Sequence, residues 1–265
     1  LEGSSPHETE EAEAQRWQEL YAGLEFWDDV HGGGLPWKMV KDARCEEIGF
    51  MRKRKIWTGR SIDECWQKTG KPPVSVRWVD TNKGDETLGE MLARSRLVAR
   101  DFKGGDKNRD DLFAASPPME AKRMLLSRAA TKGGTRGPRC LMFIDVKKAH
   151  TIPKCEEDVY IELPEECGAP SGSCGKLDYW LYGFRPAASA WERHYSGLFE
   201  NEGFVRGVGC GVVFYHRGRD ISLAVHGDDF TFCGARGDLE WIRDKMESWF
   251  EIKVRGFMGL SLIHI

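Results

Sequence analysis

The residues best suited to do chemistry are three aspartates in two separate stretches, Asp145, Asp228 and Asp229. Asp228 and Asp229 follow Gly227 between two mostly apolar runs in residues 221–233. An apolar run, a Gly-Asp turn and a second apolar run predict a β-hairpin. Because neighbouring carboxylates repel each other, such a tip favours a divalent metal ion, whose preferred ligands are oxygens.

Asp145 ends a second apolar stretch, within residues 141–150. A buried strand that ends on a carboxylate is typical of a site at a strand terminus. Asp145 and Asp228 could together bind two divalent ions about 3.5–4 Å apart, as in phosphoryl transfer. Alternatively, the Gly-Asp residues only build a turn and Asp145 only caps the following segment. The residues alone leave both interpretations open.

Two alternating segments further upstream, residues 74–80 and 95–102, predict an antiparallel strand pair joined by a long loop. Four cations accompany the second segment: Arg94, Arg96, Arg100 and Lys103. Alternation puts the three arginines on one face, where guanidinium groups can bind a polyphosphate bidentately. The alternative is an exposed edge strand that its charges keep soluble.

Helical spacing of apolar residues predicts the other elements. An aromatic stripe predicts a packing helix at Trp17, Leu20, Tyr21, Leu24 and Trp27, followed by a glycine linker at residues 32–34. Pro36 opens a second helix that ends in the basic run 52–55. Two more helices are expected over 187–199 and from 239 to 249, the latter capped by Asp238. Strands and helices interleave without regular βαβ alternation, which favours an α+β fold.

Composition excludes several classes of protein. The 265 residues are 40% hydrophobic, enough for a core, and the net charge of -3 means that a nucleic-acid partner needs a local basic groove. The eight cysteines form no Cys-x-x-Cys pair, which argues against a zinc site or disulfide scaffold and favours a reducing compartment. We expect no membrane span and no signal peptide.

Six blocks between Arg94 and Phe230 resemble, in order, the reverse transcriptase of copia-type retrotransposon polyproteins. They are RSRLVARDFKG, FAASPPMEAKRMLLSRAA, FIDVKKAH, DVYIELPEE, KLDYWLYGFRPAASAWERH and VHGDDF. The resemblance implies the fingers and palm of a right-hand polymerase, with an antiparallel palm sheet backed by helices. It implies fingers and palm within 35–259, divided into about 70–135 and about 136–259. The residues of 1–34 themselves predict an acidic, partly helical leader. The tail 260–265 does not match, so a truncation before the thumb and ribonuclease H domains is expected.

The resemblance also implies residue roles. Asp145 and Asp228 would ligate two Mg²⁺ (or Mn²⁺) ions, and Asp229 would complete the acidic centre. The triphosphate would contact Arg94, Arg96, Arg100 and Lys103. The nucleotide pocket would be shaped by Tyr182, Gly183 and Arg185. His150 stands where the family has the aromatic residue that blocks a ribose 2′-hydroxyl.

The implied activity is RNA-directed DNA polymerisation, a nucleotidyl transfer from a dNTP to a primer 3′-hydroxyl. The implied partners are an RNA or DNA template-primer, dNTPs and the rest of the polyprotein, with its integrase, thumb and ribonuclease H. The expected location is intracellular, in a cytoplasmic retroelement particle or the nucleus. Two alternatives remain: an inactive remnant that only binds nucleic acid, and a metal-dependent nuclease that uses the same three aspartates.

Overall fold

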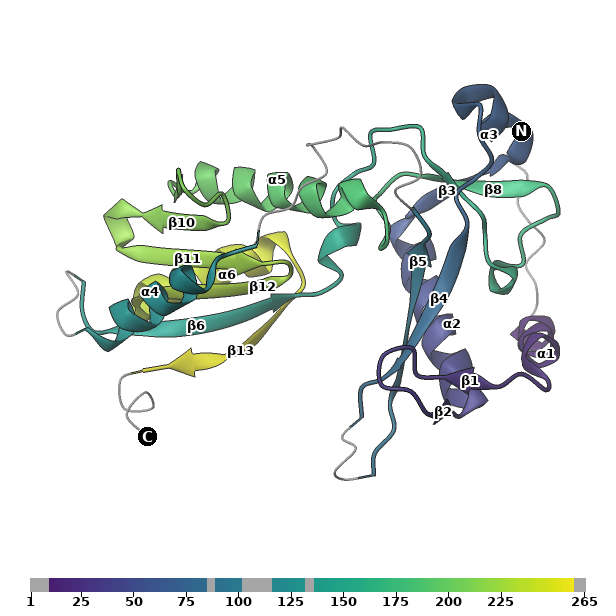
Figure 1. The fold of residues 1–265 in the computed structure, drawn as a ribbon, viewed down its shortest axis with the longest axis horizontal. Helices are drawn as coiled ribbons and strands as arrows, with labels where there is room; N and C mark the ends of the chain where they lie inside the picture. The colour runs from purple at the N-terminus through teal and green to yellow at the C-terminus, as the bar shows by residue number, and fades with distance from the viewer. Residues whose placement is uncertain (1–9, 85–88, 102–115, 132–135, 260–265) are drawn as a thin grey trace. The chain divides into compact units, whose positions relative to one another are not determined.

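The structure is a computed structural model that describes residues 10–84, 89–101, 116–131 and 136–259 (Figure 1). The chain forms two compact units. Unit 1 consists of Leu1–Gly104 and Lys154–Phe184, and unit 2 of Gly105–Pro153 and Arg185–Ile265. Residues 154–184, which the resemblance assigned to the palm, therefore cluster with unit 1. Each unit is built from segments that are distant in the sequence.

Unit 2 is organised around a six-stranded sheet of order β13-β6-β12-β11-β10-β9. Its strands are β6 (Arg139–Val146), β9 (Val205–Arg206), β10 (Val213–His216), β11 (Ile221–His226), β12 (Asp229–Ala235) and β13 (Ile252–Met258). Every neighbouring pair is antiparallel. Two short 3₁₀ helices, η3 (Ala149–Thr151) and η5 (Arg217–Arg219), lie in its connections.

Helices cover both faces of this sheet. On one face, α5 (Arg185–Asn201) and α6 (Arg236–Trp249) pack Trp191, Phe199 and Ile242 into a core with Ile144 of β6. On the other face, α4 (Met119–Ala130) packs against Leu141. Figure 1 shows α4 and α6 on opposite sides of the sheet. Because successive strand residues face opposite sides, a strand buried on both faces is apolar throughout. The prediction of an α+β fold with an antiparallel sheet backed by helices is confirmed.

Unit 1 contains two strand pairs and one three-stranded sheet. Its helices are α1 (Glu10–Tyr21), α2 (Trp37–Arg54), α3 (Ile62–Thr69) and the 3₁₀ helix η4 (Glu165–Cys167). Its strands are β1 (Phe26–Trp27), β2 (Gly34–Leu35), β3 (Trp57–Ser61), β4 (Val76–Asn82), β5 (Ala93–Ala99), β7 (Tyr160–Ile161) and β8 (Ser173–Leu177). The sheet has order β3-β8-β7, while β4 pairs with β5 in antiparallel register. This confirms the predicted strand pair, although β5 ends at Ala99 rather than at residue 102.

The predicted aromatic helix ends earlier than its spacing indicated. Helix α1 stops at Tyr21, and Phe26–Trp27 pairs with Gly34–Leu35 as a small hairpin. Leu24 and Trp27 are 56% and 60% exposed, so they do not belong to the packing face. The glycines predicted as a linker instead close this hairpin, because backbone at positive φ suits glycine. The helical spacing of Leu24 and Trp27 was therefore misleading, because the chain reverses direction in a hairpin after α1.

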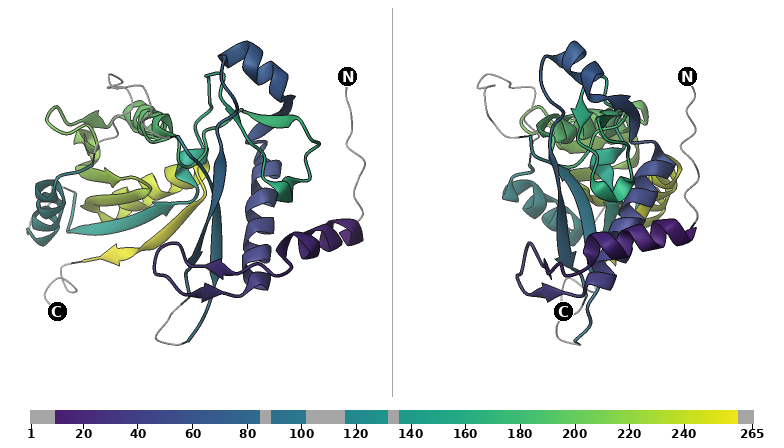
Figure 2. Two further views of the ribbon diagram at one scale, coloured as in Figure 1. Left: turned by 45° about the vertical axis from the view of Figure 1, so that its right-hand side comes forward. Right: turned by 90° about the vertical axis from the view of Figure 1, so that its right-hand side faces the viewer.

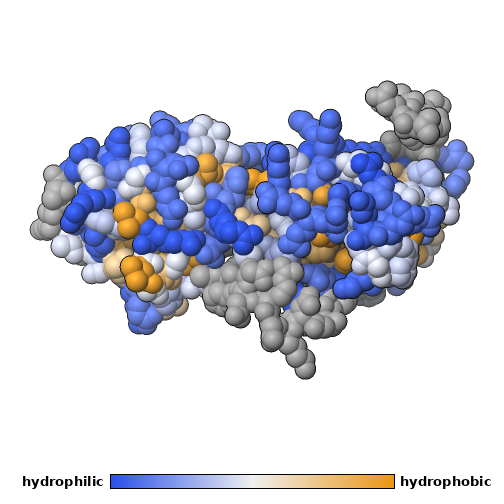
Figure 3. Space-filling view, turned by 90° about the horizontal axis from the view of Figure 1, so that it is seen from above, coloured by the Kyte–Doolittle hydropathy of each residue, from blue (hydrophilic) through white to orange (hydrophobic). Residues whose placement is uncertain are grey.

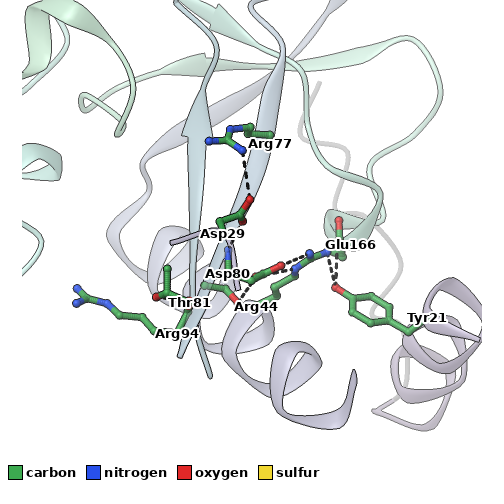
Figure 4. Close-up of polar contacts among 9 residues, drawn as sticks. Tyr21, Asp29, Arg44, Arg77, Asp80, Thr81, Arg94 and Glu166 are labelled. Carbon is green, nitrogen blue, oxygen red and sulfur yellow. Dashed lines mark hydrogen bonds and ion pairs between the residues drawn. The ribbon is translucent and has the colours of Figure 1, made fainter. Parts of the chain in front are cut away.

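A buried polar network ties α1 to the rest of unit 1 (Figure 4). Arg44 of α2 forms ion pairs with Asp80 of β4 and Glu166 of η4. Arg44 also donates to the Tyr21 hydroxyl at 3.1 Å, and that hydroxyl donates to Glu166 at 2.9 Å. Burial, with the Glu166 charge, raises the pKa of Tyr21, although Arg44 opposes the shift. Helix α1 thus packs against α2 through both apolar and charged groups (Figure 2).

The predicted cap of α6 is wrong. The N-cap residue is Ala235, and Asp238 lies in the first turn of the helix. Its carboxylate accepts from Arg136 Nε at 2.7 Å and from Arg219 Nη1 at 2.9 Å. Burial opposes ionisation of Asp238, but these two guanidinium groups lower its pKa. Asp238 thus forms ion pairs with residues distant in the sequence, which the local sequence does not reveal.

The described part of the chain has no helix with the length and apolarity required to cross a bilayer. The face drawn in Figure 3 is mainly hydrophilic, with small separate hydrophobic areas. All eight cysteines are free thiols.

Candidate active site

The hairpin predicted around the aspartate pair is present in unit 2. Strands β11 and β12 pair up to His226 and Asp229, which leaves Gly227 and Asp228 as a two-residue turn. Gly227 has φ +64°, a positive φ of the kind that two-residue hairpin turns take at their first central residue. Asp228 therefore sits in the turn, while Asp229 is the first residue of β12.

Asp145 lies directly opposite Asp229 on the neighbouring strand. Strands β6 and β12 pair with Asp145 and Asp229 as Cα partners. Opposing residues of an antiparallel pair have Cα atoms about 4.5–5.5 Å apart and side chains on the same face. The Val146 N–H donates to the carbonyl oxygen of Asp228 at 2.9 Å, which fixes the turn to the end of β6. The structure thus brings the three aspartates to one end of the sheet.

The acidic end of the sheet has an electrostatic cost. Asp145 and Asp228 are half-buried, and Asp229 is exposed. Partial burial, followed by the negative charges of Asp228 and Asp145, raises the pKa of Asp229. A cation at this end would relieve the repulsion, which is the condition for metal binding by carboxylates.

Trp191 forms a hydrogen bond with the turn that bears Asp228, a role that the sequence did not reveal. Its indole Nε1 donates to the carbonyl oxygen of Gly227 at 2.9 Å. The ring is buried in the core, edge-on to Tyr195 and Phe230. Helical spacing identified Trp191 as a core residue of α5, but no local signal indicates which carbonyl an indole N–H meets.

Arg255 is the second residue that sequence reasoning missed. Its Nη2 atom lies 3.4 Å from Oδ2 of Asp145. Arg255 belongs to β13, which pairs with β6 on the side opposite β12. Asp229 is the last of the predicted site residues in the chain. Arg255 follows it after the helix α6, and nothing in the neighbouring sequence indicates that Arg255 contacts Asp145.

The donor set fits a divalent ion, although it is not a closed metal cage. Among the residues that the structure describes, no group of three or more His, Cys, Asp or Glu is arranged to hold a metal ion on its own. Mg²⁺ is usually bound by one or two carboxylates, with waters and substrate phosphates completing its octahedron. The three aspartates would therefore hold such ions together with a substrate.

The predicted phosphate-binding arginines lie in unit 1. Arg94 and Arg96 alternate along β5 with buried Ser95 and Leu97; Arg94 is exposed, whereas Arg96 is half-buried. The Arg96 guanidinium lies over the Tyr182 ring, 5.0 Å from its centroid. Arg100 is exposed just beyond the strand. Lys103 lies outside the described residues. The structure thus brings one of the predicted arginines, Arg96, to the 182–183 turn.

Gly183 allows the turn to approach the end of β5. It has φ +90°, and a Cβ there would lie 2.1 Å from the carbonyl oxygen of Ala99. The Ala99 N–H donates to the carbonyl oxygen of Tyr182 at 2.7 Å. From the sequence, we expected Gly183 to allow the backbone to approach a ligand closely. In the structure, the group that it approaches is the backbone of Ala99.

The remaining predicted pocket residues, His150 and Arg185, belong to unit 2 with the aspartates. His150 lies in η3 and Arg185 is the first residue of α5, and both are half-buried. The η3 helix packs against α5. The predicted site residues are therefore divided between two units.

Comparisons with known proteins give the chain a context. A family model described as reverse transcriptase (RNA-dependent DNA polymerase) matches residues 65–264. The chain is 25% identical over 207 residues to the retrovirus-related Pol polyprotein from transposon TNT 1-94 of Nicotiana tabacum. That match covers 73% of this chain and 15% of the polyprotein. A solved structure of apo telomerase from Candida tropicalis, truncated from its C-terminal domain, aligns with 84% of this chain and 55% of its own, at 10% identity and a TM-score of 0.43.

Proposed function

Because the chain belongs to the reverse transcriptase (RNA-dependent DNA polymerase) family, we propose that it extends a primer by transferring nucleotides from dNTPs to its 3′-hydroxyl. The predicted resemblance to the copia-type retrotransposon enzyme is confirmed by the family match and the transposon relative. The chain spans only a small part of that polyprotein's length, so its activity is a proposal. The observation that best supports it is the pairing of Asp145 with Asp229 beside the Asp228 turn.

In this proposal, Asp145, Asp228 and Asp229 hold two divalent ions, Mg²⁺ or Mn²⁺. Such ions lower the pKa of a hydroxyl nucleophile and neutralise charge on the transferred phosphate and the leaving group. The contribution of the protein is to position these three carboxylates. Asp145 and Asp229 present their carboxylates from adjacent strands, and the bonds from Val146 and Trp191 fix the turn that bears Asp228.

In this proposal, residues of about 70–135 act as the fingers and residues of about 136–259 as the palm, which would include Lys154–Phe184 of unit 1. Arg94, Arg96 and Arg100 would contact the triphosphate, since guanidinium groups bind phosphate oxygens bidentately. The stack on Tyr182 restricts Arg96, so less side-chain entropy is lost when a phosphate binds. Lys103, Gly183, Arg185 and His150 complete the proposed nucleotide contacts.

The proposed partners are an RNA or DNA template-primer, dNTPs and the remaining parts of a polyprotein, including integrase, thumb and ribonuclease H. The template would be held through its backbone and shape, because copying requires indifference to base sequence. The proposed place of action is inside the cell, in a cytoplasmic retroelement particle or the nucleus.

Primer extension by the full chain tests this proposal. With a labelled primer on an RNA template and Mg²⁺ or Mn²⁺, Asp228→Asn should lower extension at least about a hundredfold, equivalent to about 2.7 kcal/mol. Asp244→Asn, the same change at an exposed position of α6, should leave extension at the wild-type level. Template binding without extension would instead identify an inactive remnant, and strand cleavage without incorporation would identify a nuclease.

A further inference from the structure

The strand that borders the acidic site is irregular at one residue. Strand β13 pairs with β6 up to Val254, and the register shifts before pairing resumes at Gly256. Arg255 is the extra residue of this β-bulge. Gly256 has φ +142°, a backbone conformation that favours glycine. Bulges next to functional sites characteristically redirect a side chain. The irregularity thus falls on the one residue of β13 that forms an ion pair with Asp145.

The contact between Arg255 and Asp145 is electrostatic and loose. The 3.4 Å separation of Nη2 and Oδ2 exceeds the usual 2.7–2.9 Å of a charge-assisted hydrogen bond. The Arg255 side chain is 54% exposed, and that of Asp145 is 22% exposed. Ion pairs open to solvent contribute little free energy and exchange readily. Arg255 can therefore neutralise Asp145 without locking it.

The Arg255 guanidinium lies beside Oδ2 of Asp145, and a carboxylate that ligates a metal can still accept hydrogen bonds, so the ion and Arg255 compete through their charges. A metal at ligand distance, about 2.0–2.1 Å for Mg²⁺, would lie a few ångströms from the guanidinium charge. Repulsion between cations at that separation disfavours joint occupancy. Binding of the ion therefore favours a position of Arg255 farther from Asp145, which its exposed side chain permits.

From this geometry, and resting on the proposed function, we propose that Arg255 is an internal counter-ion for Asp145 that opposes the binding of a divalent ion. In the metal-free protein, Arg255 balances the charge of Asp145 through this loose, exposed contact. It also lowers the affinity of the site for metal, so it sets the ion concentration at which the site fills. Arg255 is thus a positioning residue, not a catalytic one.

Lys253 provides a matched control. It is exposed on the same strand and is the Cα partner of Asp145 on β13. Within the described part of the chain, Lys253 forms no ion pair. Removing its charge changes the general electrostatic potential near the site but not the specific contact with Asp145.

The test is a titration of the full chain with Mn²⁺ alone, in which the electron paramagnetic resonance signal of free Mn²⁺ reports binding. Arg255→Met should tighten binding by about two- to fivefold, the range expected from loss of an exposed ion pair. Lys253→Met should have a clearly smaller effect. In an Asp145→Asn background, Arg255→Met should no longer change the affinity. Circular dichroism would establish that each variant is folded.

Two results would overturn the counter-ion role: Arg255→Met binding Mn²⁺ as the wild type does, or Lys253→Met tightening binding equally. The single variant Asp145→Asn separates this failure from a failure of the proposed function. If Asp145→Asn weakens Mn²⁺ binding and Arg255→Met does nothing, only the counter-ion role is wrong. If Asp145→Asn leaves binding unchanged, Asp145 is no metal ligand and both proposals fail.

Discussion

At the tip of the β11–β12 hairpin, Asp229 carries a charge that the fold disfavours. Burial raises its pKa, and the neighbouring charges of Asp228 and Asp145 raise it further. A group whose folded pKa is raised in this way costs stability once it is ionised. Functional sites commonly sacrifice stability for an arrangement of charges that a ligand later neutralises. The raised pKa of Asp229 is the cost expected of a carboxylate that a bound cation would neutralise.

Asp229→Asn should therefore stabilise the metal-free protein at neutral pH, by a few tenths of a kcal/mol because the residue is exposed. The folded wild type binds a proton more tightly than the unfolded chain does, so its stability falls as pH rises through the raised pKa. The gain should thus be largest near pH 7 and vanish below about pH 4, where Asp229 is protonated in both states. Thermal unfolding with a chelator present would measure it.

The sign and the pH trend both test this explanation. A lower melting temperature for Asp229→Asn at neutral pH would contradict it. So would a gain that persists unchanged in acid, because an effect independent of ionisation cannot arise from charge repulsion.

At the scale of elements, the contact between the 182–183 turn and β5 depends on one glycine. Gly183 has no room for a Cβ beside the Ala99 carbonyl, and its φ of +90° is unfavourable for any L side chain. The same contact places the Tyr182 ring beneath Arg96. A change at Gly183 should therefore disturb a predicted phosphate contact without touching the arginine.

We expect Gly183→Ala to destabilise the protein by at least about 2 kcal/mol, through the clash and the backbone strain together. Gly197→Ala is the control, because Gly197 lies inside α5 and a methyl group there would have no neighbour within 4 Å. That change should be neutral or stabilising by about 0.5–1 kcal/mol. Urea denaturation measures both, and equal effects of the two substitutions would refute the close-approach argument.

At the scale of the whole molecule, each unit has its own apolar core. In unit 1, Trp17 and Tyr21 of α1 pack with Val40 and Ile48 of α2. In unit 2, Phe199 of α5 lies in a cluster of aromatic rings under the sheet. Separate cores mean that damage to one unit should raise local opening mainly in that unit.

Hydrogen exchange followed by mass spectrometry tests this separation. Phe199→Ala should cost about 3–5 kcal/mol and accelerate exchange mainly in unit 2, whereas Trp17→Ala should do the same in unit 1. Val208→Ala, at a fully exposed position of unit 2, should accelerate exchange in neither unit. Equal acceleration of both units by either core substitution would show instead that the two cores unfold as one.

Local patterns in the sequence determined most elements and their types. The alternating segments at 74–80 and 95–102 do form a strand pair, with bounds Val76–Asn82 and Ala93–Ala99. The hairpin at 221–233 and the helices α2, α5 and α6 are present as predicted. These predictions succeeded because strand alternation, turn glycines and helical periodicity arise among residues a few positions apart. The ordered blocks of the copia-type resemblance identified the family, and no shorter motif would have done so.

Only the tertiary structure decided how these elements meet. The predicted helix failed at Trp27 because a glycine hairpin reverses the chain there, and Asp238 meets distant arginines rather than capping its helix. The placement of Asp145 opposite Asp229 depends on the register of β6 against β12. That register is set by the simultaneous burial of both sheet faces, under α5 and α6 on one side and α4 on the other. Gly256 is a local signal for the bulge in β13, but the contact of Arg255 with Asp145 depends on the pairing of β13 with β6.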